Sequence, residues 1–431
     1  MITAQPITTA NSLMSVLLSW VERLGLVLLL AMPLMMFLGI ATCDIAIISI
    51  AVLFIVRCAL LRDFSWLNTQ WVRVGLVLWA YLIMISFYAL MSSHLSFKQA
   101  LPFGRYIVFA AALQYWLLRS EAYRRYLVYA LTMVALFIAI DIIFTFLTGF
   151  SVLGNSSVQY HHYDHITWIW ERQFTRIVGL NGKMNYGIML AWISVPVIVS
   201  LLMNMMKSRR LWHITLSAVA VMIICMAVFM TGERMALLEL GLGLLLIFCL
   251  IKPLRLLMFI VGSFTLLAAI LLVTHNPALW DRNVSQIHHS VVGFWDNDYG
   301  RIMRASWAIF SEHPLFGVGL KQYFLISKSP HYLHFNAINS HVQNIYLEFL
   351  TGTGVVGCLL FGALLYFWIK QFWQHRTAIK TAPILIAVLI AFILRSWPFA
   401  STTSFFFAWG AITFWWMGAW LLASLEEKQH A

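Results

Sequence analysis

Long apolar segments follow one another along the chain, separated by short polar connections and by two longer ones. Runs of about 17 to 25 apolar residues are long enough for a helix to cross a hydrocarbon core about 30 Å thick. The pattern predicts twelve spans, near 24–41, 44–61, 74–91, 101–118, 126–147, 185–206, 212–230, 235–251, 254–273, 344–369, 382–399 and 403–424. Barrel strands would instead be about ten residues long. We therefore expect an all-α polytopic membrane protein in which residues 1–431 form a single integral membrane domain.

The composition agrees with this pattern. Hydrophobic residues make up 62% of the chain and charged residues only 10%. A soluble domain of 431 residues is excluded, because so few polar residues could not cover its surface. The five cysteines lie in or beside apolar segments without metal-ligand spacing, so we expect neither a disulfide framework nor a metal site from them.

Basic residues mark one side of the membrane. They cluster in every second connection, at Arg57, Arg62 and Arg73; Arg119, Arg124 and Arg125; Lys207, Arg209 and Arg210; Lys252 and Arg255; and Lys370, Arg376 and Lys380. The positive-inside rule makes this side the cytoplasm and places both termini there. The opposite side then carries two long loops, 148–184 and 274–343, and all but three of the fourteen histidines. Polar chemistry is therefore expected on the outer side.

The first outer loop contains two polar stretches. Tyr160–His165 holds three histidines and an aspartate, but its spacing fits no metal geometry and a solvated loop would tolerate it. Arg176–Asn185 opens the next span, and Gly179 and Gly182 allow a tight return to the membrane. Arg176 could anchor the loop to lipid headgroups or contact a substrate, and the pattern leaves both interpretations open.

Another arginine stands in a very short outer turn, Thr231–Met235, between two apolar spans. An arginine at the membrane rim is costly unless it is paired. Glu233 could neutralise Arg234; alternatively, Arg234 offers its guanidinium to a phosphate, which it can contact at two points. We favour the phosphate, because the neighbouring motifs also indicate an anion.

The large outer loop contains an amphipathic stretch. Apolar residues recur there at helical spacing, at Ile302, Ala305 and Ile309. This spacing predicts a short helix over Arg301–Glu312, on which Arg301 and Arg304 share one face. His313–Pro314 should end the helix, and the glycines that follow permit a turn.

The large loop returns to the membrane at Ser340–Gly357. A general base needs this setting, close to lipid and still wet enough to exchange protons. His341 is the candidate base in this stretch. The alternative interpretation is a polar cap on a transmembrane helix, with Asn344 near the N-cap.

Together these stretches resemble the O-antigen ligase and polymerase superfamily. The matching residues are Arg176, Gly179 and Asn185; Thr231–Arg234; Gly300, Arg301, Trp307, Ala308, Phe310 and His313–Gly319; and Asn344, Tyr346, Leu347, Gly354 and Gly357. The resemblance covers about 170 to 360, and the combination is specific to the superfamily. One position departs from it: a histidine is expected directly before Asn344, where this chain has Gln343, with His341 two residues earlier.

The resemblance implies a glycosyltransferase of lipopolysaccharide biosynthesis in the bacterial inner membrane, with its site on the periplasmic side. The donor would be a glycan on undecaprenyl pyrophosphate and the acceptor a sugar hydroxyl, usually on lipid A-core. The pyrophosphate supplies the energy, so no cofactor, metal or nucleic acid is expected. Direct displacement implies inversion at the anomeric carbon, because no second carboxylate is positioned as a nucleophile.

The resemblance also suggests roles for individual residues. We assign the base to His341 and the anion clamp to Arg234 and Arg301. Arg304 and Arg176 would support the clamp. The residues expected to orient the acceptor or the base are Gln343, Asn344 and Tyr346.

The sequence leaves other functions open. An O-antigen polymerase or a protein O-oligosaccharyltransferase of the same superfamily would share this site and differ in its acceptor. A lipid-linked glycan transporter or flippase would belong to another class. It should place charged groups at the bilayer midplane and often shows a repeat between its halves. This chain places them at one rim without an evident repeat, so we favour the transferase.

Overall fold

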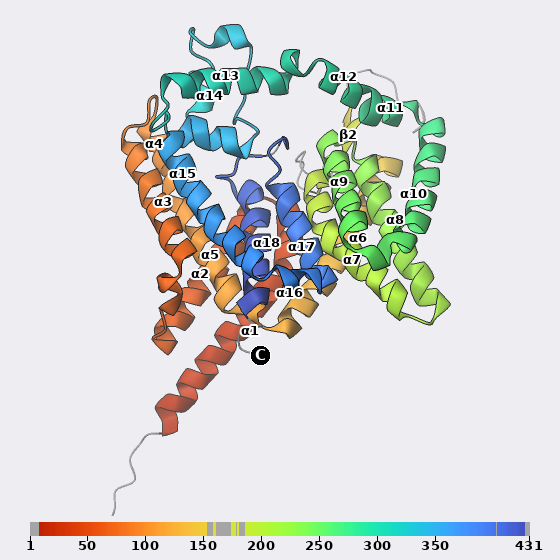
Figure 1. Ribbon diagram of the computed structural model, residues 1–431, viewed down its shortest axis with the longest axis horizontal. Coiled ribbons are helices and arrows are strands. Elements are labelled where there is room, and N and C mark those ends of the chain that lie inside the picture. The colour runs from red at the N-terminus through yellow and green to blue at the C-terminus, as the bar shows by residue number, and fades with distance from the viewer. Residues whose placement is uncertain are drawn as a thin grey trace, which may run out of the picture.

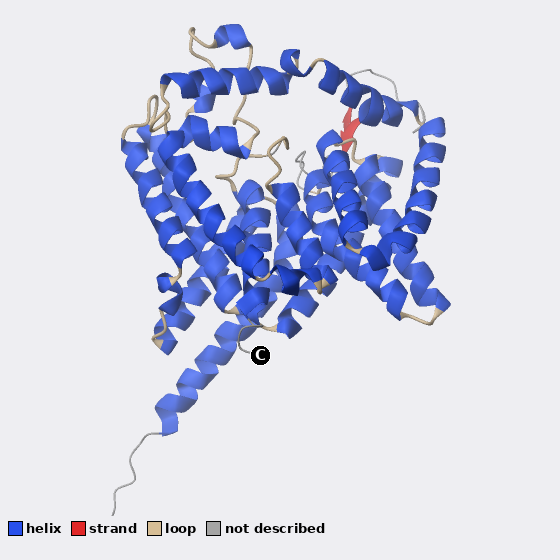
Figure 2. Ribbon diagram, in the orientation of Figure 1, coloured by secondary structure: helices blue, strands red, loops and turns tan. Residues whose placement is uncertain are grey.

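The computed structural model describes residues 8–152, 158–160, 174–177, 179–180, 186–401 and 403–426. This part of the chain is almost entirely helical (Figure 2). The exception is an antiparallel pair of short strands, β1 (Val158–Tyr160) and β2 (Phe174–Ile177). The predicted class, an all-α polytopic membrane protein, is confirmed.

Each of the twelve predicted spans coincides with a helix. The helices are α1 (Thr8–Leu38), α2 (Ile40–Leu61), α3 (Gln70–Phe87), α5 (Gly104–Tyr115), α6 (Glu121–Thr148), α7 (Tyr186–Lys207), α8 (Leu211–Met230), α9 (Arg234–Leu250), α10 (Arg255–His275), α15 (Ile345–Gln374), α17 (Pro383–Arg395) and α18 (Ala408–Glu426). Within the described residues, eight helices are long and apolar enough to cross a membrane. The count of twelve is therefore not confirmed: α5, α9 and α17 have 12, 17 and 13 residues, and α18 is rich in tryptophan.

Shorter helices connect these long ones. On the side of the short basic connections they are η1 (Ser65–Asn68), η3 (Leu117–Arg119), η4 (Lys252–Leu254) and α16 (Arg376–Lys380). On the other side they are α4 (Ser93–Ala100), η2 (Leu101–Phe103), α11 (Pro277–Trp280), η5 (Asp281–Ser285), α12 (Gln286–Val292), η6 (Phe294–Asp296), α13 (Asp298–Glu312), α14 (Tyr323–Ile326) and η7 (Leu333–Phe335).

The long helices form a bundle, and the large outer loop arches over one end of it (Figure 1). The arch rises from the end of α10, continues through α11, α12 and α13, and returns to the bundle at α15. α7 lies at the centre, packed on α6, α8, α9 and α17, which explains why it is apolar on every face. α10 is almost entirely exposed, as expected of a helix whose apolar surface meets lipid. The beginning of α1 and the end of α18 lie at the end of the bundle opposite the arch.

The amphipathic stretch of the large loop forms α13, which contains the predicted helix Arg301–Glu312 and begins three residues earlier. Asn297 caps it, accepting hydrogen bonds from the Tyr299 and Gly300 amides. The apolar residues at helical spacing, Ile302, Ala305 and Ile309, are all buried. The helix ends before His313, as predicted.

The turn after α13 is joined to α15 through backbone hydrogen bonds. The amides of Val318 and Gly319 donate to the carbonyls of Thr351 and Gly352, each at 2.9 Å. At this point α15 is interrupted, because Gly354 has φ 62° and ψ −169°. A Cβ at Gly354 would lie 2.3 Å from the Leu315 carbonyl oxygen. The glycine is required both by its own φ and by the close approach of the turn.

We expect Gly354→Ala to destabilise the protein. The left-handed conformation alone costs a non-glycine residue roughly 1–3 kcal/mol, and the clash with Leu315 adds to it. The thermal unfolding midpoint of the purified protein in detergent should fall clearly. The matched control is Gly362→Ala on the same helix, where an added Cβ meets nothing within 4 Å. Equal midpoints for the two variants would contradict the close approach.

The orientation that the basic connections predict can be tested directly. The arch helix α12 and the short helix α16 lie at opposite ends of the bundle (Figure 1). A reporter that is active only in the periplasm should function when fused near Gly293, after α12, and should be silent when fused near His375, before α16. The reverse result would overturn the orientation and the periplasmic site.

Candidate active site

A cavity of about 230 Å³ lies beneath the arch, where the chain gathers residues from four regions. One wall is the beginning of α9 and the roof is the segment from α12 to α13. The start of α15 and the connection between α17 and α18 complete the lining. The lining includes Arg234, Leu238, Ser290, Asn297, Tyr299, Gln343, Asn344, Phe399 and Ser401.

Arg234 faces this cavity from the first turn of α9. Its Nη1 donates to Ser290 Oγ on α12 at 2.5 Å and to the Gln286 carbonyl at 3.3 Å. Among the described residues, none accepts a hydrogen bond from its Nε or Nη2. Glu233 turns the other way, and its carboxylate accepts from the Ile188 amide of α7 at 2.8 Å. The geometry therefore favours the phosphate interpretation of Arg234 over neutralisation by Glu233.

The arginine turn also contacts the first outer loop. The Ile177 amide at the end of β2 donates to the Thr231 carbonyl at 3.1 Å, which brings the backbone of Arg176 next to this turn. The Arg176 side chain lies outside the described part of the structure, as do Asn181–Asn185 and the histidines of Tyr160–His165. In the described residues, no group of three or more His, Cys, Asp or Glu side chains could hold a metal ion.

The start of α15 has the predicted cap. Asn344 Oδ1 accepts from the amides of Tyr346 and Leu347, each at 3.1 Å, so α15 begins directly after it. Gln343, immediately before the cap, has φ 60°. This left-handed conformation is unusual for a residue with a side chain, and such strain is concentrated at functional sites. It places Gln343 on the wall of the Arg234 cavity.

His341 lies on a different cavity. This neighbouring space is small, about 30 Å³, and Lys321, Glu348 and Gln99 also line it. The His341 imidazole is hydrogen bonded to Ser340 Oγ through Nδ1, at 2.9 Å. Val342 lines both cavities and separates them. The residue that shares the cavity with Arg234 is thus Gln343, at the position where the superfamily is expected to have its histidine.

Arg301 and Arg304 lie on α13 above the cavity and do not line it. Arg301 forms an ion pair with Asp298 at 2.5 Å and keeps about 30% of its side chain exposed. Its Nε is buried without a hydrogen-bond partner in the described structure. Arg304 is exposed. Both residues remain predicted parts of the clamp, and Arg301 has to leave Asp298 before it can hold a phosphate.

The sequence analysis missed the contribution of the connection between α17 and α18. Asn344 Nδ2 donates to the Pro398 carbonyl at 2.6 Å, and the Tyr346 hydroxyl donates to the Ser396 carbonyl at 2.7 Å. Ser401 Oγ donates to Gln343 Oε1 at 3.2 Å. Asn344 and Tyr346 therefore fasten this connection to α15, and the connection in turn holds Gln343.

Two buried ionisable residues that flank Trp192, Arg395 and Glu239, were missed as well. Arg395, the last residue of α17, is fully buried; Nε and Nη2 donate to the Gly410 carbonyl, Nε at 2.8 Å. Its guanidinium lies 5.1 Å from the ring centroid of Trp192, and Trp192 Nε1 donates to the buried carboxylate of Glu239. An arginine within an apolar run was the signal that could have found Arg395.

Comparison with known proteins points to the part of the chain that lines most of the cavity. No curated protein matches the chain. Residues 218–362 match the family model described as O-antigen ligase. The match runs from within α8 into α15, and it includes the arginine turn, the arch and the start of α15 that together line most of the cavity. Over residues 218–362 the chain is therefore similar to the O-antigen ligase family.

Proposed function

We propose that the protein is an O-antigen ligase-like glycosyltransferase. It moves a glycan from undecaprenyl pyrophosphate to a sugar hydroxyl of lipid A-core, in lipopolysaccharide biosynthesis at the bacterial inner membrane. The site faces the periplasm, both termini are cytoplasmic, and membrane lipids surround the bundle. The observation that carries the proposal is the cavity beneath the arch. Its lining combines the arginine Arg234 with the polar amides of Gln343 and Asn344, at one end of the helical bundle.

The reaction needs an anion clamp and a base. The acceptor hydroxyl oxygen attacks the anomeric carbon, the bond from that carbon to the pyrophosphate oxygen breaks, and undecaprenyl pyrophosphate leaves with the bonding electrons. Arg234 stabilises the charge that grows on the leaving group, since its Nε and Nη2 point to no other described partner. Attack from the side opposite the leaving group inverts the anomeric carbon, and the step requires no metal or nucleotide.

His341 is the proposed acceptor of the hydroxyl proton. A neutral imidazole can take a proton at neutral pH, whereas the amide of Gln343 cannot. Because Val342 stands between His341 and the Arg234 cavity, the acceptor hydroxyl must be presented along the Ser340–Gln343 segment. Gln343 and Asn344 contribute hydrogen bonds and hold this segment in place.

Arg301→Ala should abolish transfer, and Arg301→Lys should restore little of it. A lysine cannot reproduce the planar two-point contact of a guanidinium with a phosphate. Contacts with charged groups are worth on the order of 1.5–3 kcal/mol, which corresponds to roughly tenfold to a hundredfold in rate. The measurement is the lipopolysaccharide profile at matched protein level. A normal profile in the alanine variant would falsify the role of Arg301.

The function itself is tested by deleting the gene in its native host and separating the lipopolysaccharide on gels. Accumulation of free lipid-linked O-chain polymer is the expected result for a ligase. Core that carries a single repeat would instead identify an O-antigen polymerase, and an unchanged profile with altered glycoproteins would identify a protein O-oligosaccharyltransferase. These enzymes would use the same cavity with another acceptor.

A further inference from the structure

The connection between α17 and α18, residues 396–407, is fastened at its beginning to the cap of α15. Tyr346 and Asn344 donate to the carbonyls of Ser396 and Pro398, at 2.7 and 2.6 Å. Both donors belong to the first turn and the cap of α15, which are themselves ordered by helix hydrogen bonds. The first part of the connection is therefore held in one position relative to Gln343.

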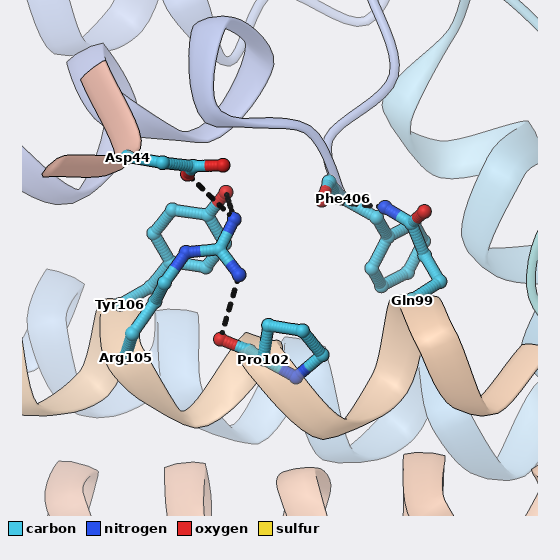
Figure 3. A network of polar contacts seen from close by, with 6 residues as sticks. All are labelled: Asp44, Gln99, Pro102, Arg105, Tyr106 and Phe406. Carbon is cyan, nitrogen blue, oxygen red and sulfur yellow. Dashed lines mark hydrogen bonds and ion pairs between the residues drawn. The ribbon is translucent and has the colours of Figure 1, made fainter. Parts of the chain in front are cut away.

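The second part of the connection is fastened from two sides. On one side the Glu348 carboxylate of α15 accepts from the Phe405 amide at 2.7 Å and from the Ser404 hydroxyl. On the other side Gln99 Nε2, near the end of α4, donates to the Phe406 carbonyl at 2.6 Å (Figure 3). These contacts join segments far apart in the sequence, so the described residues of the connection, 396–401 and 403–407, form a fixed wall.

One ring of this wall, Phe399, is strongly exposed although residues on both sides of it are held by hydrogen bonds. Phe399 is 80% exposed, whereas Ala400 beside it is only 2% exposed. Phe399, Ala400 and Ser401 all line the cavity beneath the arch. An exposed phenylalanine ring forgoes the free energy that its burial would contribute. A rigid backbone that presents this ring at a cavity therefore suggests that a ligand covers it.

The position of Phe399 indicates which ligand. Arg234 lines the cavity from α9, whereas Phe399 lines it from the connection that Ser401 joins to Gln343. In a direct displacement the attacking hydroxyl arrives on the side opposite the leaving pyrophosphate. The side of the cavity that holds Phe399, Ser401 and Gln343 is then where the acceptor approaches.

We infer that Phe399, Ala400 and Ser401 form the acceptor wall of the cavity, with the Phe399 ring stacking on the sugar that carries the attacking hydroxyl. A sugar ring has an apolar face of C–H groups, which fits the negative face of an aromatic ring, and a rim of hydroxyls, which fits Ser401, Gln343 and Asn297. This inference rests on the proposed transferase function and assigns its acceptor subsite.

Membrane anchoring is the competing explanation, because aromatic residues gather at membrane interfaces. Trp397 provides the matched comparison. It lies on the same connection, its ring centroid is 6.2 Å from that of Phe399, and it is 37% exposed, but it does not line the cavity. An anchoring role would be shared by both rings, whereas an acceptor role belongs to Phe399 alone.

The experiment measures transfer by the purified full-length protein, with lipid-linked glycan as donor and lipid A-core as acceptor, each varied in turn. Phe399→Leu keeps an apolar side chain and removes the ring. It should raise KM for the acceptor roughly fivefold to tenfold and leave KM for the donor within about twofold. Phe399→Tyr should restore the acceptor KM, and Trp397→Leu should leave both constants unchanged.

Each outcome decides the inference. An unchanged acceptor KM in Phe399→Leu overturns it, as does an equal rise in both KM values. Equal effects of Phe399→Leu and Trp397→Leu would identify membrane anchoring. If the wild-type protein itself transfers nothing, the proposed function fails and the inference falls with it. If the wild type is active and Phe399→Leu leaves the acceptor KM unchanged, the acceptor wall is refuted and the proposed function stands.

Discussion

Replacing Arg234 with alanine should lower the rate of glycan transfer by about 100- to 1000-fold, the usual loss when one preorganised donor to developing negative charge is removed. Arg234 lines the cavity beneath the arch and is held by Ser290 and the Gln286 carbonyl. Its remaining donors face no described partner, so they are preorganised for an anion. Lysine at this position should recover little, because it offers a single point of charge.

The measurement is the initial rate of transfer at matched protein level, by gel analysis of lipopolysaccharide or with purified components. Arg209→Ala is the matched control. Arg209 is exposed in the connection between α7 and α8, at the end of the bundle away from the cavity. The Arg209→Ala variant should transfer glycan at the wild-type rate. If Arg234→Ala and Arg209→Ala are equally active, the cavity does not hold the leaving pyrophosphate.

The second large effect is expected at the pair His341 and Gln343. His341→Ala should remove activity, since a general base contributes about 100- to 10,000-fold. Gln343→Ala should weaken transfer, because Gln343 positions groups through hydrogen bonds and lines the cavity with Arg234. Gln343→His should be tolerated or beneficial. Its backbone has φ 60°, a conformation in which histidine is enriched several-fold over most residues.

The double variant His341→Ala/Gln343→His sharpens this test. It moves the only imidazole of the motif from the small cavity to the cavity of Arg234. Recovery of transfer, with a rate that rises with pH through the histidine range, would show that an imidazole is the base. Normal transfer by His341→Ala alone would contradict this assignment. Catalysis would then rest on arginine electrostatics, or the chain would be a divergent relative.

Sequence reasoning succeeded where the signal is local. The apolar spacing of Ile302, Ala305 and Ile309 predicted α13, because helical periodicity is written within a few residues. Asn344 before an apolar run predicted the start of α15 for the same reason. The arginine turn Thr231–Met235 stood out because charge is rare between two spans.

The site features that the sequence did not predict depend on contacts between residues far apart in the chain. His341 and Gln343 line different cavities because the backbone of Gln343 is left-handed. Ser401, 58 residues away in sequence, holds the Gln343 side chain by a hydrogen bond. Glu348 likewise meets Phe405 across 57 residues. The exposure of Phe399 indicates a ligand only because hydrogen bonds to α15 and α4 hold the connection in place. Residue spacing cannot predict such contacts, since they arise from the packing of helices that are not neighbours in sequence.

One measurement tests the central claim most directly. The purified protein is reconstituted in vesicles with glycan on undecaprenyl pyrophosphate and lipid A-core, without nucleotide or added metal, and the linked product and released undecaprenyl pyrophosphate are quantified together. The account predicts that both appear in equal amounts and that Arg234→Ala suppresses both. Movement of the intact donor across the vesicle membrane, with neither product formed, would contradict a transferase and identify a transporter.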